Sequence, residues 1–78
     1  MKSLILTEHT PHTVAIRDAD NGQLIRVVNV DGDIVGGPSV SGNVGYVSVK
    51  KGMFKKTYVI DLQKGVTTRI FTTWLILN

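Results

Sequence analysis

The chain lacks cysteine altogether and has only two histidines and two prolines among its 78 residues. Without cysteine, disulfides and thiolate metal sites are excluded, and two histidines make a structural zinc site a poor prediction. A chain of this length buries roughly 60% of its unfolded surface and is only marginally stable alone. Small scaffolds commonly rely on disulfides, a metal or oligomerisation, so the composition favours oligomerisation.

Long apolar runs are also missing. The longest runs at the ends are Leu4–Leu6 and Trp74–Leu77, whereas a membrane-spanning helix needs about 20 apolar residues and a signal peptide needs about 7–15. The sequence therefore predicts no membrane segment, no secretion signal and synthesis in the cytoplasm. The net charge of +3 permits contact with a polyanion without requiring it.

No heptad and no long stripe of 3.6-residue period is present, while eight glycines punctuate β-branched runs. This pattern predicts one all-β domain over residues 1–78, built from short antiparallel strands. The predicted strands are 2–7, 13–17, 23–30, 34–35, 44–50, 56–62, 66–71 and 74–77, with a loop at 9–12 and a short segment at 39–40 between turns. Apolar residues occupy both faces of several predicted strands, which is typical of sheets covered on both sides.

Two segments resemble each other: VAIRDADNGQLIRVV (14–28) and TYVIDLQKGVTTRIF (57–71). Their shared aspartate, glycine and arginine lie 43 residues apart, as the pairs Asp18 and Asp61, Gly22 and Gly65, and Arg26 and Arg69. An aspartate can accept backbone N–H groups two residues on, and glycine tolerates positive φ, so both sites are predicted turns. We expect the arginines to pair with the aspartates, with anion binding as the alternative. A strand–turn–strand unit repeating every 40–45 residues is typical of a β-propeller blade.

The segment GPSVSGNVGYVSVKKG, followed by TYVIDLQKG, resembles a repeat of the PQQ-type or YVTN-type β-propellers. The matching residues are Pro38, Val40, Gly42, Asn43, Tyr46, Val47, Val59, Asp61, Leu62 and Gly65. The resemblance covers roughly residues 13 to 71, which is under two blades. The tryptophan-docking motif and the cofactor residues of the quinoproteins have no counterpart, and Trp74 lies elsewhere. The resemblance therefore implies a blade-like, antiparallel sheet rather than quinone chemistry, and no cofactor is predicted.

A lysine-rich hairpin is the clearest candidate for a contact site. Its residues are Lys50, Lys51, Met53, Phe54, Lys55 and Lys56. The lysines could attract phosphates while the phenylalanine stacks on a base. Alternatively, the lysines keep a strand edge from aggregating, or Met53 and Phe54 dock on a partner protein.

Three motif-like spacings lack the residues that their chemistry requires. Asp18–Gly22 begins like a calcium loop, but the glycine needed at the sixth position is Gln23. His9 and His12 flank a proline and are not expected on a helix, and the Gly37–Gly42 spacing lacks the lysine of a phosphate loop. The sequence predicts no catalytic, cofactor-binding or metal-binding residues, and hence a protein that is not an enzyme.

Because a single blade cannot cover its own faces, the sequence predicts a homo-oligomer, with a ring as the expected form. The candidate interface comprises the apolar ends Leu4, Leu6, Trp74, Leu75, Ile76 and Leu77. The predicted function is that of a self-assembling structural or scaffolding protein, by analogy a component of a virus or phage particle, which contacts other structural proteins. The alternative is a small basic β-barrel that binds nucleic acid through the lysine-rich hairpin.

Overall fold

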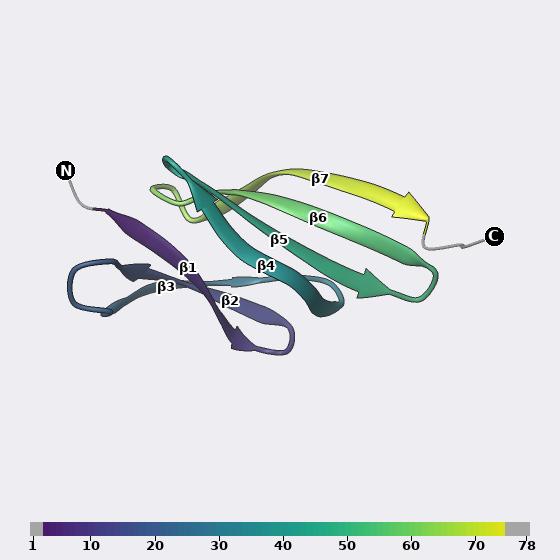
Figure 1. The fold of residues 1–78 in the computed structure, drawn as a ribbon, viewed down its shortest axis with the longest axis horizontal. Coiled ribbons are helices and arrows are strands. Elements are labelled where there is room, and N and C mark those ends of the chain that lie inside the picture. Colours follow the sequence, from purple (N-terminus) through teal and green to yellow (C-terminus); the bar gives the residue numbers. More distant parts are fainter. Residues whose placement is uncertain (1–2, 75–78) are drawn as a thin grey trace.

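The computed structural model describes residues 3–74, and this part of the chain contains seven strands and no helix. The all-β, antiparallel prediction is therefore confirmed. Within the described residues, no helix is long and apolar enough to cross a membrane. The strands form two sheets joined by one crossing of the chain (Figure 1).

The first sheet has three strands in the order β1-β2-β3, and the second has four in the order β4-β5-β6-β7. Every strand pairs antiparallel with its sequence neighbour, so each sheet is a meander. The bounds are β1 Leu4–Thr10, β2 Thr13–Asp18, β3 Leu24–Asn29, β4 Asp33–Ser41, β5 Val44–Lys51, β6 Phe54–Asp61 and β7 Val66–Trp74.

Three predicted details differ from the structure. The predicted loop at 9–12 shrinks to a turn, because β1 continues to Thr10. The fragments predicted at 34–35 and 39–40 form one strand, β4, in which register shifts accommodate the glycine and proline residues. An edge strand tolerates Pro38 because it need not donate to a neighbour on both sides. The separate strand predicted at 74–77 is also not seen as such, because β7 reaches Trp74 unbroken, and residues 75–77 lie outside the described part.

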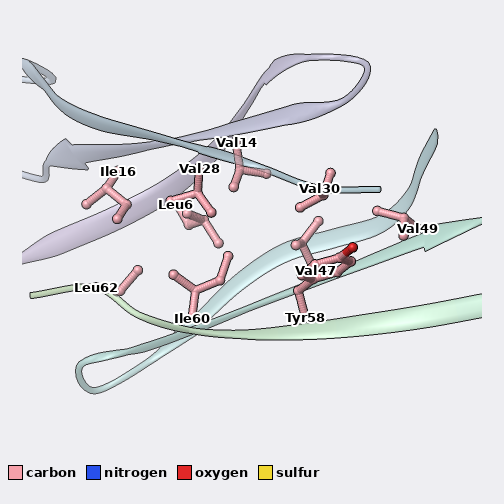
Figure 2. Packing of buried hydrophobic residues seen from close by; sticks show 10 residues of the cluster. All are labelled: Leu6, Val14, Ile16, Val28, Val30, Val47, Val49, Tyr58, Ile60 and Leu62. Carbon is pink, nitrogen blue, oxygen red and sulfur yellow. The ribbon is translucent and has the colours of Figure 1, made fainter. Parts of the chain in front are cut away.

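A core fills the space between the two sheets (Figure 2). The first sheet and the residue after β3 contribute Leu6, Val14, Ile16, Val28 and Val30, and the second sheet and the residue after β6 contribute Val47, Val49, Tyr58, Ile60 and Leu62. A Cβ at Gly45 would lie 2.8 Å from Leu6 Cδ2, so this glycine lets the two sheets approach closely. One chain therefore covers one face of each sheet itself. The expectation that copies of the chain cover exposed sheet surface stays a prediction for the outer faces alone.

The outer face of the four-stranded sheet stays accessible. Tyr46 alternates with the buried Val47 along β5 and keeps 39% of its surface exposed. Apolar residues on both faces of β5 thus do not mean that both faces are buried. In the single chain the outer face stays uncovered, and it carries apolar residues such as Tyr46 among polar and basic ones.

The hairpins β2–β3 and β6–β7 share one local geometry. In both turns the glycine N–H donates to the aspartate carbonyl over 2.8 Å, from Gly22 to Asp18 and from Gly65 to Asp61. In both ladders the register shifts directly after an equivalent pair, which is Ile16↔Arg26 in one and Val59↔Arg69 in the other. The 43-residue similarity therefore reflects the same hairpin made twice.

Candidate functional site

The free sheet edges are the most exposed feature of this fold that could serve a function. The edge strands are β1 and β3 in the first sheet and β4 and β7 in the second. β4 carries Pro38 and two register shifts, and β1 carries Glu8 and one shift, all of which discourage pairing with another chain. β3 and β7 have no proline, and each has a single charged residue, an arginine.

Apolar side chains line both of these strands. On β3 the exposed ones are Leu24, Ile25 and Val27, and on β7 they are Val66, Ile70 and Phe71. Exposed apolar strands with an unpaired edge are templates for another strand. Because β3 and β7 belong to different sheets, the molecule presents two such templates.

β7 is the more accessible of the two. Ile70 lies opposite Tyr58 in the ladder, on the core side of the sheet, yet 47% of its surface is exposed. Phe71 lies opposite Thr57 on the outer face and is 51% exposed. β7 forms the border of the molecule away from the three-stranded sheet (Figure 1), so both of its faces and its edge are accessible.

A shallow groove of about 350 Å³ follows the outer face beside β7. Its lining combines aromatic, apolar and basic groups, from Tyr46, Val59, Thr68, Arg69 and Phe71. The Arg69 guanidinium lies over the Phe71 ring, 5.7 Å from its centroid. This cation–π contact places the single charge of β7 directly beside an exposed aromatic ring.

No protein-family model matches this chain, and no curated protein or solved structure is significantly similar to it. Its function must therefore be inferred from its own surfaces.

The lysine-rich hairpin is divided between the two faces of the sheet. Its two-residue loop is Gly52–Met53, and Lys50 lies directly opposite Lys55 on the outer face. Lys51 and Lys56 lie on the inner side, where both contact Asp31. The Lys51 ammonium donates to both Asp31 carboxylate oxygens at 2.7 Å, and Lys56 Nζ lies 3.6 Å from Oδ2. Two of the four lysines are thus already paired.

The sequence does not identify Asp31, because no motif connects it to Lys51 and Lys56, which lie 20 and 25 residues further along the chain. The hydrogen bond from Lys51 holds the pKa of the Asp31 carboxyl below its ordinary value. A lowered pKa means that the interaction stabilises the fold above the ordinary aspartate pKa. That contribution is lost as the pH falls through the lowered value.

Met53 and Phe54 have different surroundings. Met53 is exposed at the tip, and docking on a partner protein stays a prediction for it. Phe54 is only half exposed and lines a hollow of about 480 Å³ on the inner side, together with Lys51, Lys56 and Thr72. Phe54 is therefore not the freely projecting ring that base stacking at the tip would need.

Only part of the predicted terminal interface lies in the described residues, and two of its members are engaged within the chain. Leu6 is buried in the core, and Leu4 is partly buried against it, so both are engaged within the chain. Trp74 ends β7, opposite Phe54 in the ladder, while Leu75, Ile76 and Leu77 lie outside the described residues. Exposed apolar residues are instead most numerous on β3 and β7, with three on each strand. In the sequence, the only signal of these two strands is apolar residues on both faces with one arginine each.

The predicted turn residues shape the hairpin ends. The Asp18 carboxylate accepts the N–H of Asp20, and the Asp61 carboxylate accepts those of Gln63 and Lys64. Arg26 crosses to Gly65, where an added Cβ would clash with Arg26 Cδ. Arg69 instead lies over Phe71, so the two equivalent arginines serve different contacts.

The histidines belong to the surface of the first sheet and its turn. His12 Nδ1 donates to the Gly32 carbonyl at 2.9 Å and lies 3.5 Å from Asp33. Within residues 3–74, no group of three or more potential ligands is placed to hold a metal ion.

Proposed function

We propose that this chain is a non-catalytic structural protein that assembles with copies of itself through its exposed strands. The observation that carries this proposal is the pair of unprotected apolar edges, β3 and β7, one on each sheet. Two contact edges per molecule allow an assembly to propagate, and it closes into a ring where the rotation between copies fits.

The proposal keeps the blade-like sheet implied by the propeller resemblance as the unit that assembles. β4 to β7 form a four-stranded antiparallel meander, which is the strand number of a propeller blade, and the resembling residues 38–65 lie within it. We extend the proposal, by analogy, to a component of a virus or phage particle in contact with other structural proteins.

The test is the mass of the native chain in solution. Light scattering coupled to gel filtration, at micromolar to millimolar concentrations, is expected to give a mass that is a multiple of 8.5 kDa and that rises with concentration. A mass of 8.5 kDa throughout this range would contradict the proposal.

Nucleic-acid binding is the second candidate, and one specific observation favours it. Lys50 and Lys55 lie on the same outer face as Tyr46, Arg69 and Phe71, so this face combines positive charge with exposed aromatic rings. Single-stranded nucleic acids bind to surfaces that join these two features.

This candidate predicts binding to a labelled single-stranded oligonucleotide that weakens as salt is added. Lys50→Glu should weaken binding more than Lys64→Glu, which makes the same charge change at the exposed turn after β6. Fluorescence anisotropy measures both. Equal losses in the two variants, or no binding at low salt, would exclude a specific role for this face.

A further inference from the structure

The sequence of β7 is nearly symmetric about its central residue, Ile70. The strand reads VTTRIFTTW from Val66 to Trp74. Next to Ile70 lie Arg69 on one side and Phe71 on the other, which are the two partners of a cation–π contact. Beyond them come two threonines on each side, and then an apolar residue, which is Val66 at one end and Trp74 at the other. A strand with this symmetry is complementary to itself when a second copy runs antiparallel to it.

Resting on the proposed self-assembly, we propose that β7 pairs with β7 of a second copy, antiparallel, about a twofold axis at Ile70. The pairing joins the two four-stranded sheets into one continuous sheet. The contact is isologous, which means that each copy uses the same residues.

The geometry of an antiparallel ladder supports this register. Alternate residues of β7 direct their N–H and C=O groups to β6, and the others direct them to the free edge. An axis through a residue pairs positions that lie equally far from it on either side. The N–H and C=O groups on the free edge of one copy therefore always lie opposite those on the free edge of the other. The two strands can form backbone hydrogen bonds without a shift in register.

The side chains that become opposite neighbours are also compatible. Ile70 meets Ile70 of the second copy, and Arg69 meets Phe71 twice. Arg69 already lies over its own Phe71 ring, so the pairing places each guanidinium between two rings on one face. Arg69 is the single charged residue of β7, so no like charges lie directly opposite each other.

The register shift beside Thr68 sets the length of the contact. Val59 pairs with Arg69 and Ile60 with Thr67, which leaves Thr68 as the extra residue, and its hydroxyl donates to the Val59 carbonyl. Such a bulge ends regular pairing on the edge side. Regular pairing therefore runs from Arg69 to Phe71, and the bulged Thr68 lies across from Thr72 of the second copy at both ends of the contact.

β3 of a second copy is the rival occupant of this edge. Its sequence, LIRVVN, has no comparable symmetry, and Asn29 has no matching residue at the other end. An isologous β7 contact joins only two copies, so a larger assembly must continue through β3. A ring built this way contains an even number of copies.

A charge exchange on the axis tests the register. Ile70→Lys and Ile70→Glu each place two like charges opposite one another and are expected to weaken dimer formation at least about tenfold. Mixing the two variants in equal amounts places opposite charges on the axis and is expected to restore a dimer, as seen by sedimentation velocity. The matched control is Ile25→Lys on β3, at a residue 48% exposed, which should leave the β7 dimer intact.

The outcomes separate the two proposals. A native chain that stays monomeric contradicts self-assembly itself. An assembling native chain with unaffected Ile70 variants, or variants that do not recover on mixing, overturns the β7 pairing alone. Dissociation by Ile25→Lys as well as by Ile70→Lys, without recovery on mixing, identifies β3 as the partner strand. Far-ultraviolet circular dichroism confirms that each variant is folded.

Discussion

Ile60→Ala is expected to lower the free energy of unfolding by about 2–5 kcal/mol. Ile60 is fully buried and lies between the two sheets, where its side chain points toward those of the first sheet (Figure 2). Removing three carbons leaves a cavity that the paired backbone of β5, β6 and β7 cannot close, because β6 is held on both sides. Urea unfolding followed by circular dichroism measures the loss.

Val35→Ala provides the control for this substitution. Val35 lies on the edge strand β4 and is 57% exposed, so its truncation should change the unfolding free energy by less than about 0.5 kcal/mol.

A domain of this size has a total stability of only about 4–12 kcal/mol, so the variant at Ile60 could be largely unfolded. Ile60→Val, with an expected loss of about 0.5–1.5 kcal/mol, then gives the same test in a folded protein. Equal effects at the two sites would contradict the two-layer core.

Gly32→Ala is the second substitution with a large expected effect. It should lower the free energy of unfolding by about 3 kcal/mol or more. Gly32 has a φ of 140°, and a Cβ there would lie 2.6 Å from the Lys50 carbonyl oxygen. An unusual backbone angle alone costs about 1–3 kcal/mol. The clash adds to this, because its nearest atom belongs to the backbone of a paired strand and cannot rotate away.

Gly42→Ala isolates the backbone contribution. Gly42 also has positive φ, at 62°, but a Cβ there meets nothing within 4 Å. Gly42→Ala should therefore lower the free energy of unfolding by about 1 kcal/mol. The difference between the two variants, measured by thermal or urea unfolding, reports the close approach at Gly32. Similar losses at both glycines would show that this approach is not tight.

The large effect at Gly32 follows from its position where the chain crosses between the sheets. The Val30 N–H donates to the His12 carbonyl, and the Asp31 N–H donates to the Tyr58 hydroxyl at 2.9 Å. Lys51 binds the Asp31 carboxylate from the second sheet. Both sheets therefore hold this crossing, and displacing it disturbs their relative placement.

Local chemistry made part of the fold predictable. The aspartate–glycine turns after β2 and β6 were identified from side chains that bond within a few residues, and alternating β-branched runs indicated the strands. The sequence predicts two fragments where the structure has β4, because glycine and proline signal breaks in a sequence while a bulged edge strand accommodates them. Only the pairing of this segment with the neighbouring strand β5 shows that it forms one continuous strand.

Contacts between residues far apart in the sequence determine which residues form the candidate sites. The bridge from Asp31 to Lys51 and Lys56 depends on how the crossing passes the second sheet, which no local pattern encodes. Leu4 and Leu6 resembled an exposed apolar end, but the stacking of the two sheets places them at the core. The accessible edges at β3 and β7 became visible only once the order of strands in each sheet was known.

Amide hydrogen exchange along β7 tests most directly whether a second copy covers this edge. With β7 paired to β6 alone, every second amide from Thr68 to Thr72 faces solvent and should exchange rapidly. Self-pairing predicts that these amides become protected as the protein concentration rises, and that Ile70→Lys removes the protection. Alternate amides that exchange rapidly at every concentration would contradict the account.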